Sequence, residues 1–197
     1  MHQYRRAHRA IIIAVATVGA ACSDSPTSQT PRVNSAAVQF DGPMAKSWSV
    51  TGNPVLVNGQ VDTNRDVVFT SPASWPQYSL QVPYVVSAER PARPGELHSY
   101  LYMQLHPSIS HTGLYGPGDC APVGPFNGCF FGHMRYEQPD YTIVEEVAPL
   151  PDSTTIEVLE ISADRIRFKF SGRAQHGGKQ ISTSHVNASG EIDAARP

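Results

Sequence analysis

The side chains with the greatest capacity for chemistry in this sequence gather in LHSYLYMQLH, residues 97–106. The stretch alternates apolar and polar residues, and in a β-strand successive side chains point to opposite faces of the sheet. Aromatic rings accompanied by a few polar groups are typical of surfaces that bind small molecules. We therefore predict a ligand-facing side of this strand, which comprises His98, Tyr100, Tyr102, Gln104 and His106.

The histidines of this face do not predict a metal site. His98 and His106 lie on one predicted strand, where they are roughly 27 Å apart at about 3.3–3.4 Å per residue. That separation is too great for one ion. Loops that bring His111 and His133 to His106 are the alternative, but exposed histidines on a strand face are more common, and we expect no metal.

The sequence carries no recognisable catalytic motif. It lacks a Gly-x-Ser-x-Gly nucleophile elbow, a phosphate-binding loop and a dinucleotide fingerprint. Glu145 and Glu146 are adjacent, so on a strand they face opposite ways and cannot act together as acid and base. We expect a protein that is not an enzyme and uses no cofactor, with an enzyme of dispersed active-site residues as the lowest-ranked alternative.

The N-terminus has the layout of a secretory signal. Arg5, Arg6 and Arg9 precede the apolar run Ile11–Val18, and small residues follow it. The run is too short to span a bilayer, since a spanning helix needs roughly 20 apolar residues. We predict a signal peptide over residues 1–21 and an extracytoplasmic location for the rest of the chain.

A cysteine follows the small residues directly, in Gly19-Ala20-Ala21-Cys22. This resembles the lipobox of bacterial lipoproteins, with Gly19 where that motif usually has leucine. The resemblance implies that Cys22 receives a diacylglycerol and further acylation, such as palmitate, and becomes the first mature residue. It also implies outer-membrane sorting in a Gram-negative cell, because Ser23 follows the cysteine. An ordinary signal peptide with an incidental Cys22 is the alternative.

We predict that residues 22–35 form a flexible, lipidated linker. Ser, Thr, Pro, Asn and Gln dominate this segment, which holds too little apolar surface to fold. Residues 36–197 are then long enough for one domain with a core. The chain has 17 acidic and 15 basic residues, and three of the basic ones precede Cys22. This acidic balance excludes a nucleic-acid partner and an anionic-lipid site on the domain.

The other two cysteines, Cys120 and Cys129, lie in GDCAPVGPFNGCF. An exported chain meets an oxidising compartment, so we predict a disulfide between them. Zinc is the alternative, but zinc sites favour the tighter Cys-x₂₋₄-Cys spacing, and only His133 is close by in sequence. The surrounding segment, residues 107–140, is rich in glycine and proline and is predicted to be a long ordered loop that packs at one end of the domain.

The 17 prolines make long helices improbable, and two-residue alternation recurs instead. Thr154–Ile161 and Arg165–Ala174 predict a hairpin, and Asn58-Gly59 between β-branched residues predicts another. The fold class is all-β, a single antiparallel β-barrel or β-sandwich of eight to ten short strands. The predicted core comprises Leu101, Met103, Leu105, Ile156, Val158, Ile166, Phe168 and Phe170.

The segment TTIEVLEISADRIRFKFSGRA, followed by a Gly-Gly turn and a final strand ending NASGEID, resembles the C-terminal half of small bacterial lipoprotein β-domains, some with calycin-like barrels. The resemblance implies a cell-envelope domain of this class and supplies no catalytic residues. We predict a non-catalytic binding module for a small apolar or amphipathic ligand, anchored to the membrane by its lipid. The alternative is a structural or interaction lipoprotein with an envelope protein as partner.

Overall fold

The computed structural model describes residues 32–41, 46–140, 142–178 and 181–197. The predicted signal peptide, Cys22 and most of the predicted linker lie outside these residues. The chain divides into two units, Met1–Arg32 and Val33–Pro197, and every strand that the structure describes belongs to the second. The described strands are β1 (Ser35–Phe40), β2 (Lys46–Thr51), β3 (Leu56–Val57), β4 (Gln60–Val61), β5 (Val67–Trp75), β6 (Leu80–Arg90), β7 (His98–Leu105), β8 (Gly113–Tyr115), β9 (Phe130–Glu137), β10 (Ile143–Pro149), β11 (Thr155–Ile161), β12 (Arg165–Gly178) and β13 (Ile181–Ala195).

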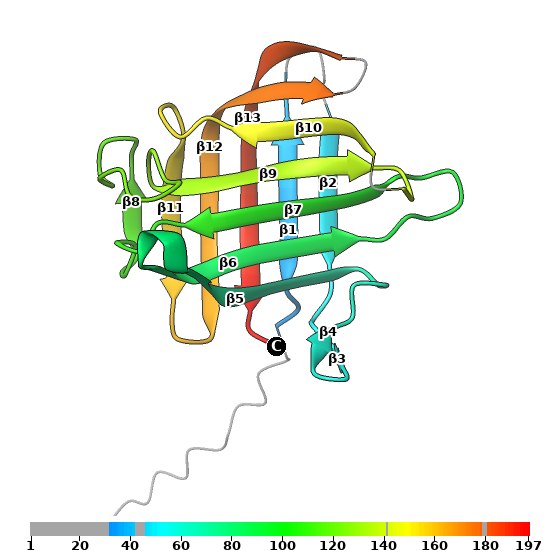
Figure 1. Cartoon of the computed structure of the whole chain (residues 1–197), viewed down its shortest axis with the longest axis horizontal. Coiled ribbons are helices and arrows are strands. Elements are labelled where there is room, and N and C mark those ends of the chain that lie inside the picture. The colour runs from blue at the N-terminus through cyan, green and yellow to red at the C-terminus, as the bar shows by residue number, and fades with distance from the viewer. Residues whose placement is uncertain (1–31, 42–45, 141, 179–180) are drawn as a thin grey trace, which may run out of the picture. The chain divides into compact units, whose positions relative to one another are not determined.

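Eleven of these strands form one antiparallel sheet, in the order β2-β1-β13-β12-β10-β9-β7-β6-β5. Off this path, β11 pairs with β12, and β8 pairs with β11. The sheet curls over on itself into a half-barrel. Figure 1 shows β5, β6, β7, β9 and β10 running across β1, β2, β12 and β13. We call the first set the front layer, and β1, β2, β8, β11, β12 and β13 the rear layer. The predicted all-β antiparallel fold is confirmed.

The long strand β12 joins the two layers. Its first half pairs with β11 and its last residues, Ala174–Gly177, pair with β10, while β13 follows its other edge. At the change of partner, a Cβ on Gly172 would meet the Ser153 carbonyl oxygen at 2.5 Å. Glycine therefore lets the connection from β10 to β11 pass against β12.

The space between the layers is filled with apolar side chains from both, and all eight predicted core residues are buried. The strands confirm the alternation read from the sequence, because Leu101, Met103 and Leu105 of β7 face inward. The predicted hairpins are also present. Asn58 and Gly59 turn the chain between β3 and β4 with φ of 52° and 80°, the left-handed values that a two-residue hairpin turn requires.

The strand count exceeds the eight to ten predicted, chiefly because the segment 107–140 is not one loop. It contains the short β8 and the eight-residue β9, which pairs with β7 and β10. Gly132 obscures the alternation of β9, yet it is required there because a Cβ would meet the Tyr102 carbonyl oxygen at 2.5 Å.

The remaining loop between β7 and β9 packs against both sides of the front layer. Cys120 and Cys129 are joined by a disulfide with their Cα atoms 5.0 Å apart, as the sequence predicts. Ile109 and Tyr115 enter the core between the layers. Phe126 instead lies on the outer side, in a second cluster with Val82 and Val85 of β6.

Candidate functional site

The predicted ligand-facing residues lie on the outer face of the front layer, where β7 and β9 run side by side. Three of them, His98, Tyr100 and Tyr102, are partly exposed. The strand register places Tyr100 opposite Arg135 and Tyr102 opposite His133. We call the surface made by these five side chains the ring face.

Neighbouring rings of this surface contact one another and form a continuous row. His98 stacks on Tyr100 with centroids 5.7 Å apart, and His133 meets the edge of Tyr100 at 5.7 Å. His133 also stacks on Tyr102 at 5.6 Å. Ring contacts of this geometry hold aromatic side chains in fixed positions, so the ring face is a preorganised platform of flat surfaces.

Gln104 and His106 are not part of that platform, because both side chains are buried. Gln104 is buried and donates a hydrogen bond to the Tyr102 hydroxyl. His106 is buried against Phe126, with Nδ1 2.7 Å from the Ser108 hydroxyl and Nε2 3.0 Å from the Ala121 carbonyl oxygen. The contacts of His106 with Ser108, Ala121 and Phe126 hold the loop on the sheet.

His98 lies between two carboxylates at the end of the ring face. Its Nε2 is 2.9 Å from Glu89 on β6 and its Nδ1 is 3.9 Å from Glu137 on β9. Burial raises the pKa of Glu89, because the charged carboxylate loses water that the hydrogen bond from His98 only partly replaces. The arrangement ties three adjacent strands together through one imidazole.

Arg135 forms the basic part of the ring face. It donates a hydrogen bond of 3.0 Å to the Tyr100 hydroxyl, and its Nε is 3.1 Å from Glu146 on β10. Burial raises the pKa of Tyr100, which stays a neutral donor and acceptor at physiological pH. The pKa of His133 is lowered by burial and then by the Arg135 charge, so the ring that contacts both tyrosines is uncharged. The middle of the platform therefore combines the neutral rings of Tyr100 and His133 with the paired cation of Arg135.

The adjacent carboxylates of β10 face opposite sides of the sheet, as the sequence predicts. Glu146 pairs with Arg135 on the outer face, whereas Glu145 faces the rear layer. There it is 3.2 Å from Lys46 of β2 and 3.3 Å from His176 of β12. This second polar cluster links the two layers and has no contact with the ring face.

A separate hollow of about 590 Å³ crosses the outer face of the rear layer. It exists because the outward side chains of neighbouring strands are short, while longer side chains stand at its rim. The short residues are Ala37, Ser47, Ser49, Ser171 and Ser189, and the rim includes Gln39, Leu114, Glu157, Lys169 and Glu191. We call it the serine groove, and its volume is in the range of small-molecule sites.

Neither surface shows metal chemistry. Within the described ranges, no group of three or more His, Cys, Asp or Glu side chains is placed to hold an ion. The alternative site formed by His106 with His111 and His133 is not assembled, because His106 bonds to Ala121 and His133 lies against the tyrosines. Across the same ranges there is also no helix with the length and apolar character to cross a membrane.

Sequence reasoning missed His133 and Arg135 because it left their strand inside a loop. The signal was present in FFGHMRYE, residues 130–137, where Phe130, Met134 and Tyr136 alternate with polar residues. The alternation becomes evident once Gly132 is accepted as an inward position. No family model, curated protein or solved structure matches this chain.

Proposed function

We propose that this protein is a lipid-anchored envelope protein that acts as a non-catalytic binding module for a small amphipathic ligand. Acylation at Cys22 and export follow from the lipobox resemblance, and place the domain outside the cytoplasm, at the outer membrane in a Gram-negative cell. The ligand binds on the ring face. We also propose that the domain is related to the calycin-like domains of bacterial lipoproteins.

The observation that carries the proposal is the row of four mutually packed rings on β7 and β9. Partly exposed aromatic rings keep apolar surface in contact with water. A flat apolar group that stacks on the rings displaces this water, which favours binding. The hydroxyls of Tyr100 and Tyr102 and the guanidinium of Arg135 supply polar contacts beside the rings. This combination suits a ligand with a planar apolar part and polar substituents.

The location of the rings also favours surface binding over enclosure. The inward side chains of both layers fill the space between them, including Phe168 at 0% exposure and Met103 at 0%. A ligand held by this domain would therefore bind on an outer face, where it is accessible from the envelope.

The second candidate is an interaction protein with an envelope protein as its partner. The serine groove favours it, because an open hollow crossing several strands offers backbone and hydroxyl groups to an extended chain. The two candidates use opposite layers, which makes them separable by mutation.

The test is native mass spectrometry of the acylated protein extracted from membranes in mild detergent. We expect a co-purifying small molecule with the wild-type protein, its loss from Tyr102→Ala, and its retention by Ser189→Lys, which fills the serine groove. Loss from the groove variant with retention by Tyr102→Ala would transfer the site to the rear layer. A protein that carries no small molecule in any form would support the interaction candidate.

A further inference from the structure

The hairpin of β3 and β4 carries exposed apolar side chains that the fold does not use. Val55, Leu56 and Val57 are consecutive and are 40%, 53% and 52% exposed. A run of three exposed apolar residues is avoided on a soluble surface unless it has a function. The hairpin forms its own two-stranded sheet, separate from the main one, so these side chains are not covered by neighbouring strands.

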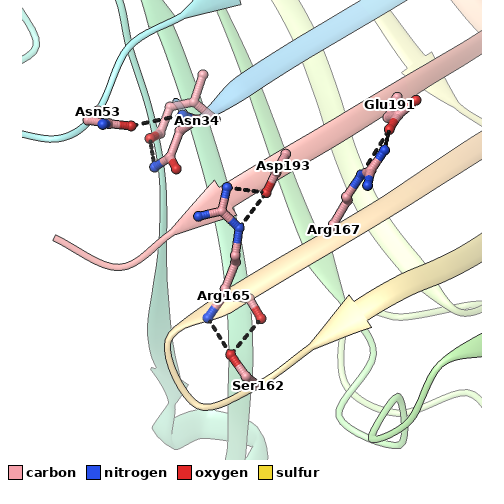
Figure 2. Close-up of polar contacts among 8 residues, drawn as sticks. Asn34, Asn53, Ser162, Arg165, Arg167, Glu191 and Asp193 are labelled. Carbon is pink, nitrogen blue, oxygen red and sulfur yellow. Dashed lines mark hydrogen bonds and ion pairs between the residues drawn. The ribbon is translucent and has the colours of Figure 1, made fainter. Parts of the chain in front are cut away.

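The base of the hairpin is locked to the point where the chain enters the domain. The Asn34 backbone N–H donates to the Asn53 side-chain oxygen at 2.8 Å (Figure 2). The Gly52 N–H donates to the Asn34 carbonyl at 3.0 Å. The Asn34 side-chain amide reaches the Val68 carbonyl at 2.7 Å, on the strand that leaves the hairpin segment. One buried asparagine therefore holds both ends of the segment.

This arrangement is rigid because the two ends of the segment pass each other at Gly52. A Cβ there would meet the Asp66 carbonyl oxygen at 2.1 Å, so only glycine fits the crossing. Figure 1 shows β3 and β4 at the end of the domain where β1 begins. Val33, next to Asn34, adds a further apolar side chain at this end and is 57% exposed.

The distance from the proposed lipid anchor is short. Val33 follows Cys22 by eleven positions along the chain, which span at most about 40 Å when fully extended. We call Val55, Leu56 and Val57 the apolar tip. It is thus at the end of the domain that lies nearest to the anchored cysteine along the chain. The segment from Asn53 to Val61 contains no charged residue, so its insertion among lipid headgroups removes no charge from water.

We propose that Val55, Leu56 and Val57 form a second membrane contact, which inserts into the interfacial region of the bilayer that holds the lipid anchor. The inference rests on the anchoring at Cys22 proposed above. One lipidated point leaves the domain free to turn, whereas a second contact next to the chain entry sets which surfaces face away from the membrane. Because the tip is uncharged, its insertion depends on apolar burial and not on anionic headgroups.

The experiment uses the acylated full protein in phosphatidylcholine vesicles whose acyl chains carry bromine as a fluorescence quencher. Leu56→Trp and Val57→Trp place a reporter at the tip. Leu114→Trp is the matched control, since Leu114 is 72% exposed on β8 of the rear layer, away from the hairpin. We expect a blue-shifted and quenched emission from both tip variants, unchanged when phosphatidylglycerol is added, and neither effect from the control.

The outcomes separate the inference from the proposal on which it rests. Protein that floats with the vesicles but leaves both tip tryptophans unquenched overturns the second contact and preserves the anchor. Protein that does not float overturns both. Equal quenching at Leu114→Trp also overturns the inference, because it would mean that the domain meets the bilayer without a preferred face.

Discussion

Gly132 lies in β9 where the backbones of β9 and β7 approach closely under the ring face. A methyl group at this position would meet the Tyr102 carbonyl oxygen at 2.5 Å and the Met103 Cα at 3.0 Å. Gly132→Ala should lower the free energy of unfolding by about 1–3 kcal/mol, as overpacking does. Urea denaturation measures this change. Gly118→Ala is the control and should be close to neutral, since nothing lies within 4 Å of its Cβ.

The buried imidazoles make stability depend on pH. Burial lowers the pKa of His133 and of His106 below the ordinary 6.5, so both bind protons more tightly in the unfolded chain. Their contribution to stability is therefore complete above pH 6.5 and is lost as the pH falls below that value. His133→Gln should flatten this loss in denaturation midpoints measured on both sides of pH 6.5.

The exposed His185 provides the control, because His185→Gln should leave the slope as it is in the wild type. Glu89 contributes to the pH dependence of stability with the opposite sign to the two histidines. Burial raises the pKa of its carboxyl above 4.5, so its contribution is present below that value and is lost as the pH rises through the raised pKa. A His133→Gln variant whose stability falls below pH 6.5 as steeply as that of the wild type would contradict the role assigned to His133.

At the scale of the element, the hairpin β11–β12 supplies part of the core on the side of the rear layer. Phe170 is 3% exposed and its ring lies over Gly190 of β13, where a Cβ would meet it at 2.5 Å. Phe170→Ala should cost about 3–5 kcal/mol in unfolding free energy, because it removes a buried ring and leaves a cavity. Phe131→Ala, at a residue 36% exposed, should cost far less in the same denaturation measurement.

The loop between β7 and β9 is held both by its disulfide and by Phe126. Reduction of Cys120–Cys129 should lower stability by about 2.5–3 kcal/mol through the entropy of the unfolded chain. It should also speed chymotrypsin cleavage at Leu114, which is 72% exposed, while β11 and β12 stay protected. If both regions become sensitive together, the disulfide holds the whole domain and the loop is not a separable unit.

At the scale of the whole molecule, two cross-strand ion pairs line up along β12 and β13. Arg165 pairs with Asp193 at 2.6 Å and Arg167 pairs with Glu191 at 2.6 Å (Figure 2). Partly exposed pairs of this kind contribute little each, so the apolar core shared by the two layers carries the stability. Arg93 and Arg135 also pair with carboxylates, Asp66 and Glu146.

A substitution that changes one atom of Cys22 tests the proposed anchor. Cys22→Ser removes the thiol that acylation needs, so the variant should be released from the membrane fraction or remain unprocessed. Alkaline extraction of membranes followed by mass measurement of the N-terminal peptide reports both states. A variant that stays in the extracted membranes would contradict the lipoprotein interpretation and leave a conventional signal peptide as the explanation.

The sequence by itself determined the all-β class, the inward faces of β7, β11 and β12, and the turn at Asn58-Gly59. These features depend on local rules, since alternation decides which side of a strand is buried and a two-residue turn fixes its own backbone angles. The disulfide was predictable for a similar reason, because only two cysteines follow the proposed anchor.

Only the tertiary structure decided which strands are neighbours. His133 and Arg135 join Tyr100 and Tyr102 because β9 pairs with β7 across a long connection, and no local pattern encodes that pairing. The burial of His106 likewise depends on where Phe126 returns to the sheet. The meeting of Asn34 with Asn53 and Val68 was also beyond local reading, because contacts distant in sequence arise from the packing of the whole sheet.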